Sequence, residues 1–415
     1  MSAFRLSKPS LFNSNSERFV ALGIFLTLFL LHVVWNYFNY LKFSEFDDYI
    51  CDVQVSSHYI KGNRSVLKLK SEDFTFYTNG SKKLRSLQGR TVKVRIFNEN
   101  VTFLDYLQGF YAPSHLLGLY PQSSAQRDVA KKIEEQHEQK LLASLYKTLL
   151  LALPTTQELR EILTTFSISH LAALSGFHLG LLAFFLHLLF MYVYKFFQQR
   201  YFPWRNRNAD IFYLSLAILF IYVAFTDFPP SLLRAYAMMV VGWMIYDRGL
   251  ELLDFENLVI AVAILFVLKV QLLFSVGLWF SVAGVFYILL FVKTYQNMNK
   301  IAFFILLHLW VFITMLPIVH SLFDTFTFLQ LLSPLLTMLF IIFYPFELLA
   351  HLVGYGGVLD SWLLSLFSFK ADVYSIQVPL WFLSLYIVVS LLAVKYRFIN
   401  LVTLVLALSI FYQIV

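Results

Sequence analysis

Residues 168–182 read ISHLAALSGFHLGLL and open a long apolar run that continues to about residue 194. Three polar side chains, His170, Ser175 and His178, stand at its start. A helical run of this length can cross a hydrocarbon core about 30 Å thick. Polar groups inside it find no water, so each costs free energy unless it meets a partner or a substrate. The stretch therefore predicts a membrane segment that is more than an anchor.

Similar apolar runs recur along the chain. Of its 415 residues, 59% are hydrophobic and only 14% are charged, whereas soluble proteins carry about a quarter charged residues. The stretch 352–369 is ambiguous, since Asp360 and three glycines interrupt it and a broken helix is the alternative to a span. Counting it, we expect a polytopic α-helical membrane protein with about eleven spans. The other spans are expected at 19–41, 170–194, 209–226, 231–247, 255–270, 272–292, 301–320, 328–350, 378–394 and 397–414.

Basic residues beside these spans predict their orientation. Arg5, Lys8 and Arg18 precede the first span, which favours a cytoplasmic N-terminus over residues 1–18. That span is full-length and lacks a small-residue cleavage site, so we interpret it as a retained helix rather than a signal peptide. Four more basic residues follow the span 170–194 and favour a cytoplasmic loop there. The segment after the first span should then lie outside, in the periplasm.

Residues 46–112 carry a period of two instead of a helical period. Val92, Val94 and Ile96 alternate with Lys93 and Arg95. This alternation predicts strands with one buried face, separated by turns at Gly62, Asn79-Gly80 and Gly89. About five short strands in such a segment suit a small all-β soluble module, and an OB-like barrel is one candidate.

The net charge of +7 is concentrated in this module. Ten basic residues between positions 61 and 95 face only Glu72 and Asp73. We therefore expect a polyanion or anionic lipid headgroups as partners. The candidate contacts for a nucleic acid are Tyr59, Lys61, Arg64, Lys68, Lys70, Lys82, Lys83, Arg85, Arg90, Lys93 and Arg95. Phe74, Phe76 and Tyr77 are further candidate stacking rings, although Phe74 and Phe76 fit a core equally well.

Residues 124–154 begin polar and end apolar. The pattern predicts an amphipathic helix on the membrane surface or against the bundle, ending at Pro154. Cys51 is the single cysteine, which excludes an intramolecular disulfide and a thiolate metal cluster, and we interpret it as a small buried hydrophobe.

The polar groups of 168–182 allow three interpretations. On one continuous helix, His170 and His178 would be about 80° apart and share a broad face, with Ser175 next to His178. Ser175 and His178 could act as a nucleophile and a base, but no carboxylate in the segment orients the histidine, and a metal would need a third ligand. Alternatively they line a polar path for a substrate, or they bond between helices while Gly176 and Gly180 allow close approach.

Two further patterns interrupt apolar runs. In DFPPSLLRA (227–235), two prolines begin a new helix, and Arg234 falls one turn into it. Arg234 contacts a phosphate in a channel, or it pairs with Asp227 or reaches headgroups. In FSVGLWFS (274–281), Gly277 and Ser281 are small residues within an apolar run. They either line a substrate path or serve ordinary helix packing.

These three patterns resemble motifs of the ComEC family, the inner-membrane DNA-uptake channels of naturally competent bacteria. The first is a stretch like H-L-L-A-[IL]-S-G-x-H-x-G, and it is matched from His170 to Gly180 except at Ala172. The second, P-x-x-R-A-x-x-M, is matched at Arg234, Ala235 and Met238, with Pro230 before Ser231. The third, V-G-[FL]-x-[LF]-S, is matched from Val276 to Ser281. With an OB-like module before it, the resemblance covers most of 46–345, and 165–415 is the expected transmembrane domain.

The resemblance implies a channel for single-stranded DNA in the bacterial inner membrane during natural transformation. It implies no enzyme and no cofactor, and the chain has no nucleotide-binding loop or metalloprotease motif. Candidate path residues are His170, Ser175, Gly176, His178, Asp227, Pro230, Arg234, Gly277 and Ser281. Expected partners are single-stranded DNA, membrane lipids, a periplasmic DNA receptor, a cytoplasmic ATP-driven helicase and a separate nuclease, with a homodimer left open. A membrane enzyme using Ser175 and His178, and a transporter of another anionic solute such as a lipid or glycan precursor, are the rival functions.

Overall fold

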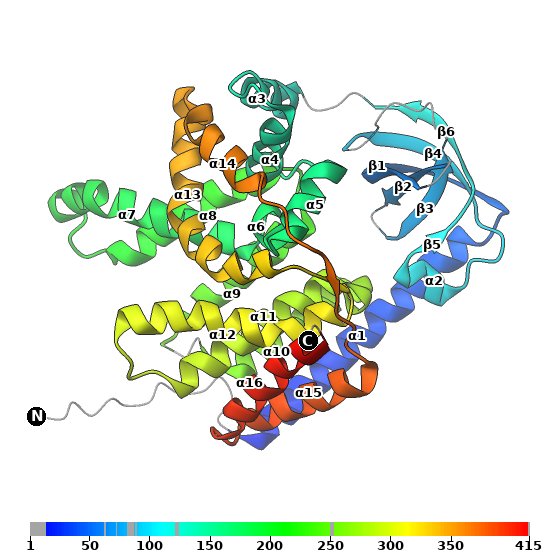
Figure 1. Ribbon diagram of the computed structural model, residues 1–415. Coiled ribbons are helices and arrows are strands. Elements are labelled where there is room, and N and C mark those ends of the chain that lie inside the picture. The colour runs from blue at the N-terminus through cyan, green and yellow to red at the C-terminus, as the bar shows by residue number, and fades with distance from the viewer. Residues whose placement is uncertain are drawn as a thin grey trace, which may run out of the picture. The chain divides into compact units, whose positions relative to one another are not determined.

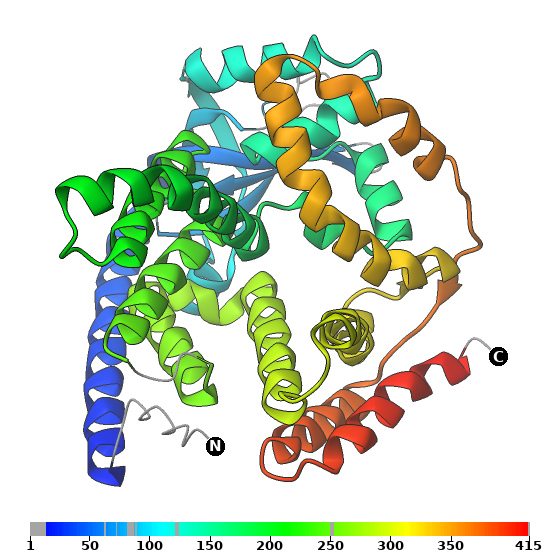
Figure 2. The ribbon, with the colours of Figure 1, turned by 90° about the vertical axis from the view of Figure 1, so that its left-hand side faces the viewer.

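The computed structural model describes residues 14–61, 64–71, 73–80, 87, 89–120, 124–249 and 253–413. The chain divides into two compact units (Figures 1 and 2). The first comprises residues up to Lys131 together with 249–251 and 259–278, and the second comprises 132–248, 252–258 and 279–415.

The first unit begins with a long apolar helix that leads into a β-sheet (Figure 1). Helix α1 (Asn15–Phe43) starts where the Ser14 hydroxyl accepts a hydrogen bond from the Glu17 amide, which satisfies one of the free donors of its first turn. The sheet has the strand order β5-β3-β2-β1-β4-β6. Its strands are β1 (Asp48–Lys61), β2 (Arg64–Lys70), β3 (Thr75–Gly80), β4 (Thr91–Phe97), β5 (Phe110–Tyr111) and β6 (Ser114–Leu119).

Alternate side chains of this sheet are buried, as the period of two predicts. Leu67, Leu69, Val92, Val94 and Ile96 are fully inaccessible. The last residue of α1, Phe43, packs in the same core, and Phe74 and Phe76 belong to it. The interpretation of those two rings as DNA-stacking groups is therefore wrong, because their faces are covered by other aromatic rings of the core, including Phe43, Tyr106 and Phe110.

The sheet is larger than expected and curls on itself. It has six strands rather than about five, and it extends past Ala112 to Leu119. Strand β5 pairs with β3 at one edge, while β6 pairs with β4 at the other. Because only Ala112 and Pro113 separate β5 from β6, the two edges must approach within a few residue lengths. The Ser114 hydroxyl also lies 3.0 Å from the Thr78 hydroxyl on β3. The sheet thus has the curvature of a barrel.

A short helix and a 3₁₀ turn complete this unit. Helix α2 (Phe103–Gln108) starts with a capping box between Thr102 and Asp105. The turn η1 (Val270–Phe274) follows α10 (Phe255–Leu268), and Gln271 on it donates hydrogen bonds of 2.8 Å to Asn36 and to the carbonyl of Asp73. These contacts fasten a segment from late in the chain to α1 and the sheet.

The second unit is helical. Its longer helices are α4 (Lys140–Leu151), α5 (Gln157–Thr165), α7 (Gly176–Tyr201), α8 (Arg207–Phe225), α9 (Pro230–Asp247), α11 (Val276–Thr294), α12 (Lys300–His320), α13 (Ser333–Val353), α15 (Leu380–Ala393) and α16 (Ile399–Ser409). Shorter pieces are α6 (Ser169–Ala172), η2 (Phe328–Leu332), η3 (Gly356–Leu359) and α14 (Asp360–Phe367). Helices α15 and α16 lie side by side and pack with α11 and α12 around the buried ring of Tyr386 (Figure 2).

Six helices among the described residues are long and apolar enough to cross a membrane, and four further apolar helices are shorter. The six are Asn15–Phe43, Gly176–Tyr201, Arg207–Phe225, Val276–Thr294, Lys300–His320 and Phe328–Val353. The expected count of about eleven spans is thus not confirmed. In 352–369, Gly354 adopts a left-handed conformation (φ 91°) and ends α13, and α14 has only eight residues. A helix of eight residues is about 12 Å long, so this stretch has the broken form and not a simple span.

The expected single helix over 124–154 is two helices, α3 (Ser124–Glu134) and α4. The break falls in a polar run that has no apolar face to bury, and at its centre the His137 side chain turns inward. The α4 helix is buried along most of its length.

Candidate functional site

Ser175 and His178 form the start of α7. Ser175 is the N-cap, in extended conformation, and its amide donates a hydrogen bond of 3.2 Å to Nδ1 of His178. The Ser175 hydroxyl lies 3.2 Å from the same nitrogen. His178 therefore occupies the position that Glu or Gln takes in a capping box, where its side chain satisfies a backbone donor. The arrangement stabilises the beginning of a helix at this point.

The other face of His178 is enclosed by aromatic rings. Its side chain is inaccessible, and Phe340 and Tyr344 of α13 meet it edge to face, with centroids 5.1 and 4.8 Å away. Since Nδ1 accepts from the Ser175 amide, the proton of the neutral ring is on Nε2. Within the described residues, Nε2 has no hydrogen-bond partner. A catalytic triad would require a carboxylate at that nitrogen.

His170 does not share a helix with His178, contrary to the expectation. It belongs to α6, and Ala173 leaves the helical conformation before Ser175 caps α7. The apolar run thus bends at 173–175, and the membrane helix begins at Gly176 rather than near residue 170. The His170 side chain is exposed, and its Nε2 lies 3.5 Å from the Thr337 hydroxyl of α13.

The first two sequence patterns meet in the structure. The Ser231 hydroxyl on the first turn of α9 donates to the carbonyl oxygen of Leu174 over 2.5 Å. A Cβ placed on Gly176 would lie 3.3 Å from Cβ of Ala235, so the glycine permits close approach of α7 and α9. Around Gly180 nothing lies within 4 Å of such a Cβ, so the same explanation does not apply there. Leu174, Leu179 and Leu232 share one buried cluster.

The turn between α8 and α9 is conformationally strained. Asp227 and Phe228 both have positive φ, 65° and 49°, which few residues other than glycine adopt without cost. Pro230 then takes the first position of α9, as the pattern predicts, while its side chain lies outside the described part. Asp227 is exposed and Arg234 is half-buried one turn further on. Strain of this kind is common where a functional surface over-determines a loop.

A third segment, 325–337, contributes to the site and was not expected from the sequence. Thr327, Gln330 and Ser333 each donate to a backbone carbonyl of the turn 164–167 that precedes α6. These bonds hold a turn in which Ser167 has a positive φ of 54°. In the sequence, this role could have been recognised only from polar side chains that recur within an apolar run. Their hydrogen-bond partners lie about 160 residues earlier in the chain.

The third sequence pattern begins α11. The Ser275 hydroxyl accepts from the Leu278 amide over 3.3 Å, as an N-cap side chain does. Gly277 and Ser281 are both exposed. Their role in a path stays a prediction.

The outer face of the sheet carries the described basic residues. Lys68 and Lys70 on β2 alternate with buried leucines, while Lys93 and Arg95 on β4 alternate with buried valines and an isoleucine. Two acidic residues of β1 moderate this charge: Asp48 is 3.2 Å from Arg95, and Asp52 is paired with Lys93 in the strand register. Lys68 lies over the ring of Tyr77, with its ammonium 5.4 Å from the ring centroid. An ammonium beside a partly exposed ring suits a nucleotide phosphate and its base.

For several expected nucleic-acid contacts the structure describes no side chain. Lys82, Lys83 and Arg85 lie outside the described residues, and of Tyr59, Lys61 and Arg64 only the backbone is described. Arg90 is exposed just before β4.

Comparison with known proteins adds one finding. The family model described as "Competence protein" matches residues 154–415, more than half of the chain. No curated protein and no solved structure gives a match. The matched range contains α6, α7, α9 and α13, the elements that surround Ser175 and His178.

Proposed function

The chain belongs to the Competence protein family, of the ComEC type, and from this premise we propose that it is an inner-membrane channel for single-stranded DNA. The family indicates a role in competence and DNA uptake, and the apolar helices indicate a membrane protein. In more detail, we propose that DNA first binds the β-sheet module and then enters through the helical domain. The module would lie in the periplasm and have an OB-like form. Binding at the sheet would require no enzymatic step by this chain.

One observation carries the proposal most directly. Within the family-matched region, the 168–182 and 227–235 patterns come together, through Ser231 and Leu174, and they bring polar side chains to one place between apolar helices. The half-buried Arg234 lies on α9, three residues after Ser231, and supplies a cation in the same pattern. A guanidinium that is only partly covered by apolar helices is favourable where it meets phosphate or water. We propose that Arg234 contacts the DNA backbone in transit.

The sheet supports the first step. Lys68, Lys93 and Arg95 lie on one face, with Tyr77 beside Lys68, and that face is turned away from the core. Such a surface binds single strands by phosphate contacts and stacking, without a sequence preference. Its partial neutralisation by Asp48 and Asp52 predicts weak, salt-sensitive binding that can release the strand again.

The test is uptake of labelled DNA by a competent strain in which this gene is deleted and then replaced by variants. We expect no transformation after deletion, and we expect Arg234→Ala to reduce transformation while the protein stays at normal abundance in the membrane. Arg234→Lys should restore part of the activity, because the charge is kept. Normal transformation after deletion would refute the channel, and lost abundance of Arg234→Ala would assign the arginine to folding.

Orientation can be tested on the same protein. Cys51 is the only cysteine, and burial raises the pKa of its thiol to about 12. It should therefore react slowly with maleimides, which act on the thiolate. A cysteine introduced at Lys93 should be labelled by an impermeant maleimide from the periplasmic side, and labelling from the cytoplasmic side alone would overturn the proposed topology.

A membrane enzyme is the second candidate, because the Ser175 hydroxyl lies 3.2 Å from a histidine nitrogen. Against it, the same nitrogen already accepts the Ser175 amide proton, and its ring has no carboxylate partner within the described residues. Nothing in this geometry favours the third candidate, a transporter of another anionic solute, over DNA.

A further inference from the structure

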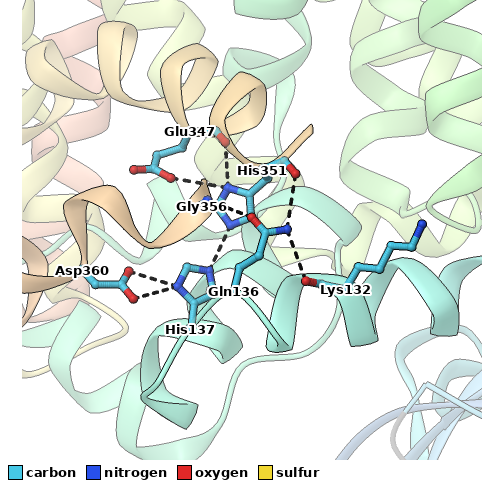
Figure 3. A network of polar contacts seen from close by, with 7 residues as sticks. All are labelled: Lys132, Gln136, His137, Glu347, His351, Gly356 and Asp360. Atoms are coloured by element: carbon cyan, nitrogen blue, oxygen red, sulfur yellow. Dashed lines mark hydrogen bonds and ion pairs between the residues drawn. The ribbon is translucent and has the colours of Figure 1, made fainter. Parts of the chain in front are cut away.

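A second polar cluster, whose members were not among the candidate site residues of the sequence, lies where the turn after α3 meets α13 and α14 (Figure 3). It contains His137, Glu347, His351 and Asp360. The side chains of His137 and Glu347 are fully inaccessible, while those of His351 and Asp360 are exposed by 5% and 18%. Four ionisable groups are thus packed together with little access to water.

The two imidazoles face each other. Nδ1 of His137 is 2.9 Å and 3.0 Å from the two carboxylate oxygens of Asp360. Nδ1 of His351 is 2.7 Å from the carbonyl oxygen of Glu347. The remaining ring nitrogens, Nε2 of His137 and Nε2 of His351, are 3.0 Å apart.

These contacts determine the number of protons. A carbonyl oxygen only accepts, so the hydrogen of the His351–Glu347 bond must be on Nδ1 of His351. A neutral His351 then has a lone pair on Nε2, and a neutral His137 that donates to ionised Asp360 has one too. Two lone pairs at 3.0 Å repel, so one further proton must lie between the rings. If Asp360 carries that proton instead, His137 accepts from Asp360 and donates through Nε2 to His351. The total number of protons in the cluster is then the same.

Groups that can interact with a proton on these rings surround the pair. Titratable groups from each adjoining element face the pair: Asp360 from α14, Glu347 from α13 and Tyr146 from α4. A carboxylate oxygen of Glu347 lies 3.4 Å from Nδ1 of His351, and within the described residues neither of its oxygens has a hydrogen bond. The Tyr146 ring stacks on His137, with centroids 4.6 Å apart, and covers it from solvent. An imidazolium here is stabilised by the Asp360 carboxylate and by the aromatic face of Tyr146.

We propose that His137 and His351 form a proton-binding site, and that the bound proton keeps the turn after α3 closed on the turn between α13 and α14. Gln136 acts as a clamp beside it: its Oε1 accepts from the Gly356 amide over 2.8 Å, and its Nε2 donates to the His351 carbonyl over 3.3 Å. A Cβ on Gly356 would lie 2.6 Å from Nε2 of His351, so closure requires glycine there. Loss of the proton would leave the two lone pairs opposed and would open the contact.

A proton fits this geometry better than a metal ion. Within the described residues there is no group of three or more His, Cys, Asp or Glu side chains arranged to share a metal. Both ring nitrogens that face each other are at ordinary hydrogen-bond distance. The site is also on the helix whose Phe340 and Tyr344 enclose His178, so α13 connects it physically with the Ser175 region.

The test is amide hydrogen exchange of the full-length protein in lipid nanodiscs, followed by mass spectrometry between about pH 6 and pH 9. The readout is the protection of the Gly356 amide after correction for intrinsic exchange. The closed form holds one proton more than the open form, so rising pH favours opening. Protection should fall by up to about tenfold per pH unit. His351→Gln and His137→Gln should remove this pH dependence, whereas His115→Gln, at an exposed position on β6, should keep it.

Gly356→Ala provides a second variant that leaves every titratable group in place. It should show fast exchange at every pH, because its methyl group prevents closure. The proposal is overturned if wild-type protection is independent of pH or rises with it, if the slope survives in both glutamine variants, or if a chelator abolishes protection, which would identify a metal. DNA is absent from this assay, so its outcome is separate from that of the uptake experiment.

Discussion

The hydroxyl of Ser231 donates a 2.5 Å hydrogen bond to the carbonyl oxygen of Leu174, 57 residues earlier in the chain. Leu174 immediately precedes the N-cap of α7, and Ser231 lies on the first turn of α9. The bond satisfies a carbonyl that the bend at 173–175 leaves outside any helix. It also sets the position of Arg234 relative to the Ser175–His178 cap.

Removing this bond should destabilise the junction. We expect Ser231→Ala to lower stability by about 1 kcal/mol, the typical worth of a hydrogen bond whose acceptor is left unpaired. Ser384→Ala is the matched control, because that hydroxyl donates to the Leu380 carbonyl of its own helix and the residue is exposed. Thermal unfolding in detergent measures both. An equal loss of thermal stability in the two variants would show that the Ser231–Leu174 bond contributes no more than an ordinary bond within a helix.

Two glycines of the first motif should respond differently to the same substitution. Gly176→Val adds atoms where a Cβ alone would be 3.3 Å from Ala235, so we expect a cost of about 1–3 kcal/mol from overpacking. A Cβ at Gly180 would have nothing within 4 Å, so we expect Gly180→Val to be tolerated. Transformation frequency and membrane abundance of the two strains check this. Loss of function in Gly180→Val at normal abundance would instead indicate that this position faces the substrate.

The capping role of Ser175 can be separated from a catalytic one. Ser175→Ala should cost about 1 kcal/mol, because a helix N-cap is lost. Ser175→Asn keeps a good N-cap side chain but has no hydroxyl nucleophile, so we expect it to restore stability and DNA uptake. Both are measured as thermal midpoint and transformation frequency. An abundant, stable and inactive Ser175→Asn protein would support the membrane enzyme.

The basic face of the sheet should bind single strands in a salt-dependent way. In fluorescence anisotropy with a labelled oligonucleotide, Lys68→Gln and Lys93→Gln should each reduce the slope of log affinity against log salt by about 0.7, one phosphate contact per lysine. Asp48→Asn should increase affinity, since it releases Arg95 from its ion pair. Lys140→Gln, an exposed lysine at the start of α4, is the control. Unchanged slopes in both sheet variants would exclude this face as the binding surface.

The sheet should lose stability as the pH falls. Burial lowers the pKa of His58 below its ordinary value of 6.5. Its Nδ1 accepts from the Leu87 amide over 3.3 Å, and its Nε2 lies 2.5 Å from the Ser65 hydroxyl, which fits a neutral ring. The unfolded state therefore binds the proton first, and stability declines as the pH drops below about 6.5.

Amide exchange at Leu87 measures this effect, and His58→Gln should flatten it. The direction is opposite to that expected at Gly356, where protection falls as the pH rises. One exchange series on the full-length protein can therefore measure both pH dependences, which have opposite directions. Protection at Leu87 that stays constant from pH 7 to about pH 5 would contradict the prediction.

The sequence by itself determined the features that depend on neighbours along the chain. The alternation of Val92, Val94 and Ile96 with Lys93 and Arg95 predicted which side chains are buried, because a strand turns successive residues to opposite faces. The apolar runs predicted helices, and the three-residue spacing of Ser175 and His178 predicted their contact. These patterns follow from backbone geometry within one or two turns.

Tertiary structure decided where the chain bends and which distant groups meet. The break of 124–154 into two helices accompanies a contact between His137 and Asp360, which are 223 residues apart. The bend that separates His170 from His178 is held by Ser231, and the turn before α6 is held by Ser333, in both cases through carbonyls that any sequence would supply. Such pairings depend on which helices pack together. Because every residue has a backbone carbonyl, the sequence does not indicate which carbonyl a distant side chain will bond. The local period therefore predicted the elements, while packing alone selected the polar groups that join them.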